Sequence, residues 1–194
     1  GMDARIGRRF LNAGLGFGGG CLPKDIRAFM ARAGELGVDQ ALTFLREVDA
    51  INMRRREKTV DLVRGSFGGS LLGHTVTVLG AAFKPNSDDV RDSPALSIAG
   101  SLSLAGASVS VYDPQAMENA KKNFPTLEYA PSIEAALEGS EMVVVATEWQ
   151  QFRDIDPVAA KKLVKRAAVL DGRNCLPTDQ WRAAGWDVTC LGRG

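Results

Sequence analysis

The feature that most constrains the fold of this chain is the alternation of short apolar runs with helical segments after residue 70. A short apolar run suits a buried strand, and apolar residues spaced by three or four positions suit one face of a helix. The expected strands are Thr75 to Leu79, Val109 to Tyr112, Met142 to Ala146, Ala167 to Leu170 and Trp186 to Leu191. The expected helices are Pro94 to Leu104, Gln115 to Phe124, Ser132 to Leu137, Pro157 to Val164 and Thr178 to Ala184. This order predicts an α/β fold, a Rossmann-like three-layer sandwich with a mostly parallel sheet and helices on both faces.

Polar loops follow these strands and are candidates for a binding site. In an open parallel sheet, ligands bind outside the carboxyl ends of the strands. The loops expected at that edge are Gly80 to Asp92, Asp113, Thr147 to Trp149 and Asp171 to Asn174. We therefore expect these segments to lie together although they are far apart along the chain.

The first 70 residues have a helical pattern. Ile26 to Leu36 follow Pro23 and predict one helix, and Gln40 to about Val63 predict a longer one. The longer helix carries an apolar stripe of Leu42, Leu45, Val48, Ile51 and Met53, with Arg54 to Lys58 expected on its solvent side. The glycine- and serine-rich stretch from Gly65 to Ser70 predicts a boundary between two domains. We expect a central helical region over residues 1–70 and a second domain over residues 71–194.

Charge and cysteine content exclude several classes of protein. The 24 basic and 23 acidic residues nearly cancel, so neither nucleic acid nor a membrane is an expected partner. The cysteines Cys21, Cys175 and Cys190 show neither zinc-ligand nor disulfide-framework spacing, and His74 is the only histidine. No metal site is expected, and a cytoplasmic location fits best. The opening Gly1-Met2 suggests a cloning remnant followed by part of a longer protein.

The glycine-rich stretch from Gly14 to Asp25 carries the strongest candidate for chemistry. Five glycines in seven positions let the backbone approach a ligand, and Pro23 places Cys21 just before a helix N-terminus. The positive end of that helix, together with Lys24, should favour the nucleophilic thiolate of Cys21. Asp25 lies one turn on, where its carboxylate can orient a water or a hydroxyl. A lone cysteine is more often an inert buried side chain than a nucleophile, so the pattern alone leaves the role of Cys21 open.

The stretch Gly16-Phe-Gly-Gly-Gly-Cys-Leu-Pro-Lys-Asp25 resembles the active-site signature of the UDP-glucose/GDP-mannose dehydrogenase family. The resemblance continues in order over essentially the whole chain, through Gly80 to Pro94, Tyr112-Asp-Pro, Thr147-Glu-Trp and Asp171-Gly-Arg173. The stretch from Arg5 to Leu11 is similar to the UDP-glucose branch. Gly20 stands where the family commonly has serine, which is a small departure.

The resemblance implies an NAD-dependent dehydrogenase that oxidises UDP-glucose to UDP-glucuronate in two hydride-transfer steps, for polysaccharide synthesis. Cys21 would form a thiohemiacetal and then a thioester with the sugar, and Asp25 would help activate the water that releases the product. The family's catalytic lysine, asparagine and glutamate and its NAD-binding domain lie upstream of the region matched here. We therefore expect this chain alone to be inactive. The family also suggests a homodimer formed through the long helix.

The resemblance assigns binding roles to a further set of residues. Those expected at the UDP-sugar are Arg5, Phe10, Leu11, Asn12, Gly14, Phe17, Gly18, Phe83, Lys84 and Arg173. Arg5 would reach the neighbouring subunit's site, Lys84 would neutralise the diphosphate, and Arg173 would lie near the uridine diphosphate. Lys24 and Arg91 would contact NAD. Ordinary packing explains Phe10 and Leu11 equally well, and a solvated surface position explains Arg5 equally well.

Other readings remain open. A GDP-mannose dehydrogenase shares much of the cysteine signature, and a nucleotide-sugar-binding module would have the fold without the chemistry. A redox sensor built on Cys21 would need a resolving cysteine, which the loop lacks. The remaining residues of note have structural interpretations: Asp88, Asp89 and Asp92 as helix caps and loop solvation, His74 as an exposed turn residue, Trp149 and Trp181 as packing, and Cys175 and Cys190 as inert thiols.

Overall fold

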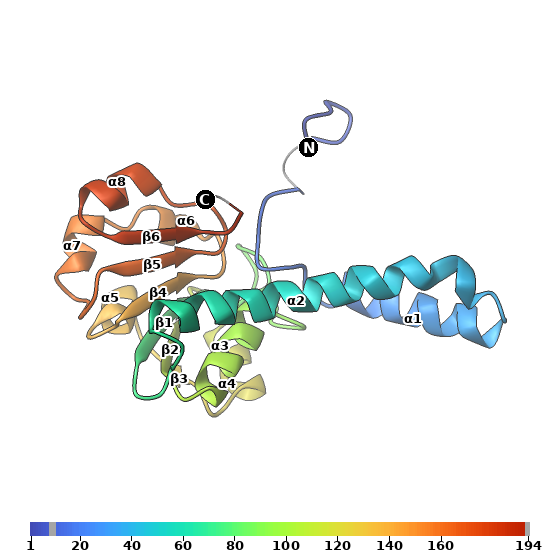
Figure 1. The fold of residues 1–194 in the computed structure, drawn as a ribbon, viewed down its shortest axis with the longest axis horizontal. Helices are drawn as coiled ribbons and strands as arrows, with labels where there is room; N and C mark the ends of the chain where they lie inside the picture. The colour runs from blue at the N-terminus through green and yellow to red at the C-terminus, as the bar shows by residue number, and fades with distance from the viewer. Residues whose placement is uncertain (8–10, 193–194) are drawn as a thin grey trace.

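The second part of the chain folds around one six-stranded parallel sheet. The computed structural model describes residues 1–7 and 11–192. Its strands are β1 (Thr75–Leu79), β2 (Ser108–Tyr112), β3 (Glu128–Tyr129), β4 (Met142–Val145), β5 (Ala168–Asp171) and β6 (Asp187–Cys190). They pair in the order β3-β2-β1-β4-β5-β6, every neighbouring pair parallel (Figure 1). The predicted Rossmann-like α/β fold is confirmed.

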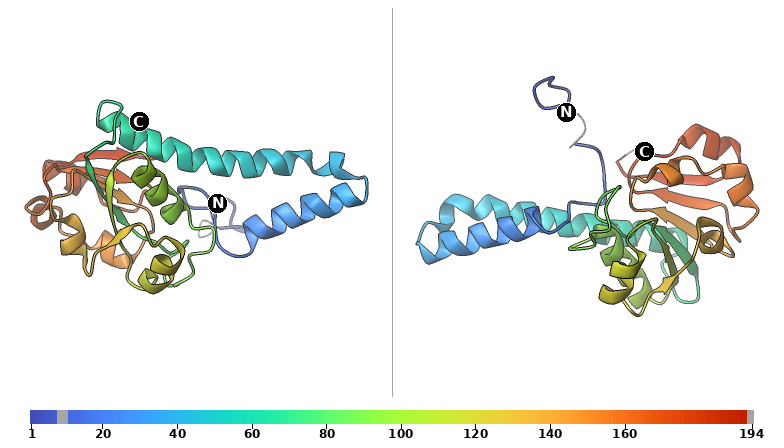
Figure 2. Two further views of the ribbon diagram at one scale, coloured as in Figure 1. Left: turned by 90° about the horizontal axis from the view of Figure 1, so that it is seen from below. Right: turned by 180° about the vertical axis from the view of Figure 1, so that it is seen from behind.

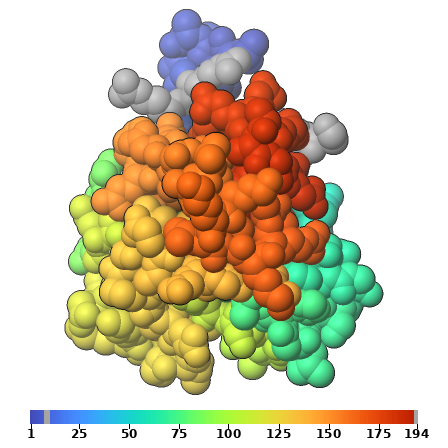
Figure 3. Space-filling view, turned by 90° about the vertical axis from the view of Figure 1, so that its left-hand side faces the viewer, coloured from blue at the N-terminus to red at the C-terminus, as the bar shows by residue number. Residues whose placement is uncertain are grey.

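Helices occupy the connections and cover both faces of the sheet. Two helices and a 3-10 turn precede β1: α1 (Leu22–Glu35), η1 (Asp39–Leu42) and α2 (Thr43–Ser66). The others are α3 (Pro94–Leu104), α4 (Met117–Asn123), α5 (Ile133–Leu137), α6 (Gln150–Arg153), α7 (Pro157–Lys161) and α8 (Thr178–Ala183). Because right-handed crossovers on either side of β1 run in opposite directions, α3 and α5 take opposite faces. Figure 3 shows the face formed by the later helices, with the N-terminal segment above it.

Local chemistry explains which elements the sequence pattern predicts well. β1 and α3 have the expected bounds to the residue. Strand β1 is an apolar run, and α3 begins at Pro94 after Ser93, whose side chain accepts the amide of Leu96. The pattern did not predict β3 or α6, which span two and four residues and are too short to show a period. Pro23 starts α1 at Leu22 rather than Ile26, because proline suits the first turn.

The core lies between the sheet and its helices. The side chains of β4 and β5 are buried along their whole length, as expected for central parallel strands. The largest fully buried side chains are Trp181 and Phe152, and Trp149 is buried too. The interpretation of Trp149 and Trp181 as packing residues is therefore confirmed.

Helices α1 and α2 form a hairpin that projects from the sheet (Figures 1 and 2). The last turns of α2 join the core through Val60 and Val63. The hairpin leaves large apolar side chains exposed along its length, namely Leu22, Phe29, Leu36, Val38, Phe44, Val48, Ile51 and Met53. Three residues of the predicted apolar stripe on α2, Val48, Ile51 and Met53, are therefore exposed to solvent. Among those residues, no helix has both the length and the apolar character needed to cross a bilayer.

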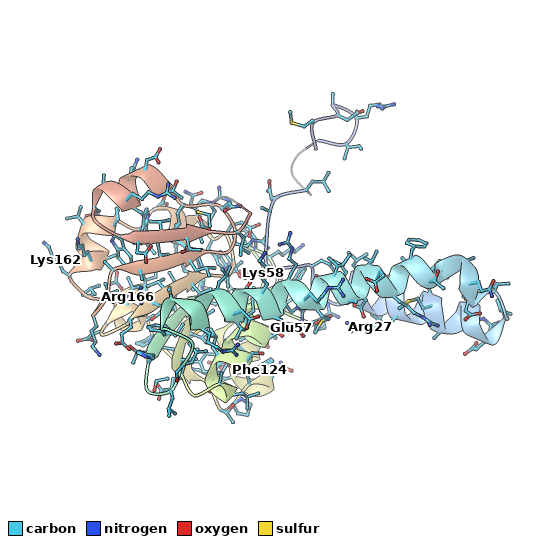
Figure 4. All side chains as sticks on the ribbon, viewed as in Figure 1. Arg27, Glu57, Lys58, Phe124, Lys162 and Arg166 are labelled. Atoms are coloured by element: carbon cyan, nitrogen blue, oxygen red, sulfur yellow. The ribbon has the colours of Figure 1, made fainter. Side chains whose placement is uncertain are left out.

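One expectation about α2 is wrong. Arg56 was expected on the solvent side with its neighbours, but it is only 5% exposed. Asn52, Arg56, Thr59, Val60 and Val63 share one buried face, because residues three, four and seven apart lie on the same side of a helix. The charged neighbours Glu57 and Lys58 do face outward (Figure 4).

At the amino end of the sheet, Glu141 joins several elements. Its carboxylate accepts the Thr75 amide at 3.0 Å, lies 2.9 Å from the Lys165 ammonium, and lies 3.1 Å from Nδ1 of His74. His74, expected to be exposed, is half-buried because its ring stacks on Phe67 at a centroid distance of 4.2 Å. The hydrogen bond with Lys165, followed by that from Thr75, lowers the pKa of Glu141 to about 2.

This depressed pKa predicts a pH-dependent contribution to stability. Relative to the ordinary value of 4.5, the ionised form of Glu141 stabilises the fold above about pH 4.5, and this stabilisation disappears as the pH falls towards about 2. Glu141→Gln is expected to lower the free energy of unfolding by about 1–2 kcal/mol at pH 7 and by almost nothing near pH 2. The value at pH 7 is reduced because solvent screens the exposed Lys165 ammonium. Urea unfolding at both pH values measures this. The same change at exposed Glu138 is the control, and an equal loss at both pH values would contradict the assignment.

Candidate functional site

The carboxyl edge of the sheet is organised by Asp113, which follows β2. This buried carboxylate accepts the amides of Ala81 and Ala82 at 2.8 and 3.0 Å and the indole N–H of Trp149 at 3.1 Å. It also accepts the amides of Gln115 and Ala116 at 2.9 and 2.8 Å. Asp113 thus ties the loops after β1, β2 and β4 together. The predicted convergence of these loops is confirmed, although the central role of one carboxylate was not foreseen.

The glycine-rich loop crosses this edge in direct contact with the loop between β1 and α3. A Cβ on Gly18 would overlap the carbonyl of Asp92, and one on Gly19 would lie 2.8 Å from the ring of Phe83. Gly19 has φ +90°, and its amide donates to the Arg91 carbonyl at 2.9 Å. Since a side chain at these positions would force the backbones apart, the glycines are what allow the two loops to pack.

On its other side, this loop is held by two buried polar side chains of α2. Asn52 accepts the Phe17 amide at 2.7 Å and donates to the Phe17 carbonyl at 3.0 Å. Arg56 donates to the same carbonyl at 3.2 Å and to the carboxylate of Asp92 at 2.9 Å. Asp92 was interpreted as a cap or a solvated loop residue, and this is corrected: Ser93 is the N-cap of α3, and Asp92 pairs with Arg56.

Cys21 lies at the N-cap of α1, as predicted, and its side chain makes no capping hydrogen bond. It is exposed. Lys24 and Asp25 lie on the first turn with their charged groups 3.4 Å apart and largely solvated. The thiol is therefore accessible at the positive end of a helix, with a carboxylate one turn away.

A hollow of about 350 Å³ lies beside this cysteine loop. Its lining includes Lys24, Arg27 and Arg91 together with the glycines Gly19 and Gly20. A hydrogen bond to the carboxylate of Asp89 holds Arg91 and raises its pKa. The structure thus brings Lys24 and Arg91, both expected at a cofactor, to one recess, which Arg27 and Asp92 also line.

A larger cavity of about 600 Å³ lies at the carboxyl ends of β4 and β5. Its lining includes Leu11, Asn12, Glu148, Arg173 and Asn174. Arg173 donates to Glu148 at 2.8 Å, and both side chains are mostly buried. Gly14 lies against the Arg173 guanidinium with no room for a Cβ. Four of the residues predicted at the UDP-sugar, Leu11, Asn12, Gly14 and Arg173, therefore meet here.

The remaining predicted site residues divide into three groups. Phe83 packs on Gly19, and the exposed Lys84 holds its ammonium 5.4 Å from the Phe83 ring. Arg5 is 89% exposed and paired with Asp3 at 2.7 Å, and it lines neither recess, although Gly1 and Met2 of the same N-terminal segment line the larger cavity. Phe10 lies outside the described residues.

The other cysteines differ from Cys21. Burial, with a smaller contribution from the nearby Asp171, raises the pKa of Cys175 to about 12. Cys190 is buried at the end of β6. Among the described residues, no cluster of histidine, cysteine or acidic side chains could hold a metal ion.

These surroundings predict selective modification of Cys21. At pH 8, iodoacetamide is expected to alkylate Cys21 at least about tenfold faster than Cys175, because only a thiolate in contact with solvent reacts quickly. Mass spectrometry of peptides over time measures both rates, and Cys21→Ser is the control that should remove the fast phase. Comparable rates at the two cysteines would contradict the burial of Cys175.

Sequence reasoning missed Asn52, Arg56 and Glu148 as parts of the site. Asn52 and Arg56 are four residues apart and therefore lie on the same, buried face of α2. The sequence did not indicate this, because polar and charged side chains on a helix are usually exposed to solvent. Glu148 lies within the recognised Thr147-Glu-Trp motif, and its position after a strand was the available signal.

Comparisons with known proteins agree with this geometry. Residues 77–178 match the UDP binding domain of the UDP-glucose/GDP-mannose dehydrogenase family, and residues 1–54 match its central domain. UDP-glucose 6-dehydrogenase YwqF of Bacillus subtilis is 38% identical over 100% of this chain and 43% of its own length. The UDP-glucose 6-dehydrogenase of Rhizobium meliloti is 39% identical over 100% of this chain and 44% of its own length.

The structural comparison gives the same result. The structure of a UDP-glucose dehydrogenase from the hyperthermophilic archaeon Pyrobaculum islandicum superposes with a TM-score of 0.81 at 37% identity, covering 99% of this chain and 41% of that one. The chain thus spans about two fifths of the length of the relatives it matches. The matched domain descriptions and the full-length similarity lead to one conclusion: the chain belongs to the UDP-glucose/GDP-mannose dehydrogenase family.

Proposed function

We propose that this chain is the cysteine-bearing and nucleotide-sugar-binding part of an NAD-dependent UDP-glucose 6-dehydrogenase, which converts UDP-glucose to UDP-glucuronate. The observation that supports this best is the packing of Gly18 and Gly19 on the loop between β1 and α3. It places Cys21 beside the carboxyl edge of the sheet, where a doubly wound fold binds ligands. The relatives named as UDP-glucose 6-dehydrogenases match over the whole chain.

The larger cavity suits the nucleotide end of a UDP-sugar. Its volume of about 600 Å³ lies within the usual range for small-molecule sites. The guanidinium of Arg173 can donate two parallel hydrogen bonds to phosphate oxygens, and Leu11 and Asn12 line the same cavity. Lys84, on the loop after β1, supplies a second positive charge for the diphosphate.

Cys21 supplies the covalent chemistry in this proposal. Its sulfur bonds to the aldehyde carbon of the half-oxidised sugar while the carbonyl oxygen gains a proton, which gives a thiohemiacetal. After the second oxidation the sugar carbon is a thioester. Water then attacks that carbon, the carbon–sulfur bond breaks, and Asp25 takes up the proton of the water.

The recess beside Cys21 fits part of the cofactor. Its lining of Lys24, Arg27 and Arg91 suits the phosphates of a dinucleotide, and Gly19 and Gly20 allow close approach. When bound, NAD would accept the hydride removed from the sugar. The exposed apolar side chains on the helix hairpin suit the interface of a homodimer. The enzyme would be cytoplasmic, and its two domains in this chain would meet near residue 70.

Calorimetric titration of the chain with UDP-glucose, UDP and GDP-mannose tests the substrate. We expect UDP-glucose and UDP to bind and GDP-mannose to bind at least about tenfold more weakly, since base recognition depends on specific polar contacts. A preference for GDP-mannose would contradict the proposed substrate. Absence of any binding would contradict the assignment of the larger cavity.

Turnover provides a separate test. This 194-residue chain alone is expected to form no NADH from UDP-glucose and NAD. The spacing Gly14-x-Gly16-x-x-Gly19 follows no strand in the described part of the chain, so it does not form the strand–turn–helix unit that binds dinucleotides. NADH absorbance at 340 nm measures formation, and sustained turnover would contradict this expectation.

A further inference from the structure

The buried polar face of α2 has no explanation in the proposed chemistry. Asn52 and Arg56 are polar side chains that are only 3% and 5% exposed. Both side chains reach the backbone of the same residue, Phe17, with three hydrogen bonds of 2.7 to 3.2 Å. Gly16 has φ +115°, and a Cβ there would overlap the Asn52 side chain. The loop is therefore seated directly on these two side chains.

Asp92 connects this seat to two further segments. Its carboxylate accepts from Arg56 at 2.9 Å, and its other oxygen lies 3.7 Å from the guanidinium of Arg27 on α1. Arg27 also pairs with Asp49 of α2 at 3.0 Å. Asp92 has φ +45°, a backbone conformation that costs energy for this residue type. The Asp92 carboxylate thus joins α1, α2 and the loop between β1 and α3.

Stability alone does not account for this arrangement. The Nε of Arg56 is buried and has no hydrogen-bond partner among the described residues. The Asp92 side chain is 25% exposed, and an ion pair that leaves one buried donor unsatisfied generally stabilises a fold less than well-packed apolar side chains do. What the arrangement does provide is a defined position for the three glycines between Phe17 and Cys21, which have little conformational preference of their own.

We propose that Asn52, Arg56 and Asp92 are positioning residues that set the place of Cys21 relative to the loop carrying Phe83, Lys84 and Arg91. The catalytic meaning of this position rests on the proposed function, but the position itself can be measured without any ligand. Reacting atoms must be placed within a fraction of an ångström for efficient attack, so a loop of glycines needs such an external support.

Amide hydrogen exchange of the whole chain tests this, with Gly19 as the reporter. Its amide donates to the Arg91 carbonyl at 2.9 Å, and this bond involves none of the three side chains. Arg56→Met keeps the bulk of the side chain and removes its hydrogen bonds. We expect it to lower the protection of the Gly19 amide at least about tenfold, while the sheet amides of Val78 and Val144 keep theirs. Arg56→Lys, which keeps the charge opposite Asp92, should restore part of the protection.

Arg55→Met is the matched control, because Arg55 is the exposed neighbour on the same helix and should leave Gly19 unchanged. If Arg56→Met does not fold, Asn52→Ala provides the second variant, with the same loss expected at Gly19. Unchanged Gly19 protection, or an equal loss at Gly19, Val78 and Val144, would overturn the positioning role. Failure of the wild-type chain to bind UDP-glucose would contradict the proposed function only, since the exchange comparison uses no ligand.

Discussion

Replacement of Arg173 by methionine is expected to weaken binding of UDP-glucose at least about tenfold. The guanidinium lines the larger cavity and is mostly buried, so its hydrogen bonds to phosphate would form away from bulk water. A hydrogen bond to a charged group is worth about 1.5–3 kcal/mol, and each 1.4 kcal/mol is a factor of ten in affinity. The variant would also leave the Glu148 carboxylate unpaired in the cavity, where its negative charge would repel the diphosphate.

Calorimetric titration with UDP-glucose measures this effect. The double variant Arg173→Met with Glu148→Gln separates the two causes, because it removes the guanidinium without leaving a carboxylate unpaired. Arg182→Met is the matched control, since Arg182 is exposed on α8 and its ion pair is with the fully exposed Asp179. Wild-type affinity in both Arg173 variants would show that the cavity is not the nucleotide site.

Asp113→Ala is expected to lower the free energy of unfolding by about 3–5 kcal/mol, which would be the largest stability effect of any single change discussed above. Four backbone amides and the Trp149 indole donate to this one carboxylate, which is 1% exposed. Alanine would leave these buried donors without an acceptor and would free three loops at the carboxyl edge. The cavity formed by those loops should then lose ligand affinity as well.

Urea unfolding at pH 7 measures the loss, with the slope of the transition checked for a change in the unfolded state. Asp113→Asn should lie between the wild type and the alanine variant, because the amide keeps one acceptor oxygen. Asp154→Ala is the control: Asp154 is exposed beside the same edge, and its loss should change stability by less than about 0.5 kcal/mol. A small effect of Asp113→Ala would mean that the loops are held by packing alone.

The Arg173 variant tests ligand binding in the larger cavity, and the Asp113 variant tests how the loops around that cavity are held. Arg173 and Glu148 lie on loops after β5 and β4, and their separation is determined by strands that pair in register, with Val145 opposite Asp171. Asp113 does not line the cavity but supports it, since its hydrogen bonds fix where the loops after β1 and β4 leave the sheet. Changes at Arg173 should therefore affect binding with little loss of stability, whereas changes at Asp113 should affect both.

Much of the fold could be predicted because its signals are local. The apolar run Thr75–Leu79 and the Ser93-Pro94 helix start specify β1 and α3 within a few residues of chain. Parallel strands require crossovers, and crossovers require helices, so the layered architecture followed from the alternation alone. The site edge could be predicted for the same reason, because the carboxyl ends of parallel strands lie on one side. β3 and α6 could not be predicted, because two and four residues are too few to show the spacing of apolar residues that identifies a strand or a helix.

The sequence by itself therefore determined the α/β architecture, the position of Cys21 at a helix start and the edge at which binding loops gather. Only the tertiary structure decided which polar side chains are buried and what they hold. Arg56 meets Asp92, 36 positions away in the chain, and Arg173 meets Glu148, 25 positions away. Helix or strand preference depends on near neighbours in sequence, whereas burial of a charge depends on a partner that another segment brings within hydrogen-bonding distance.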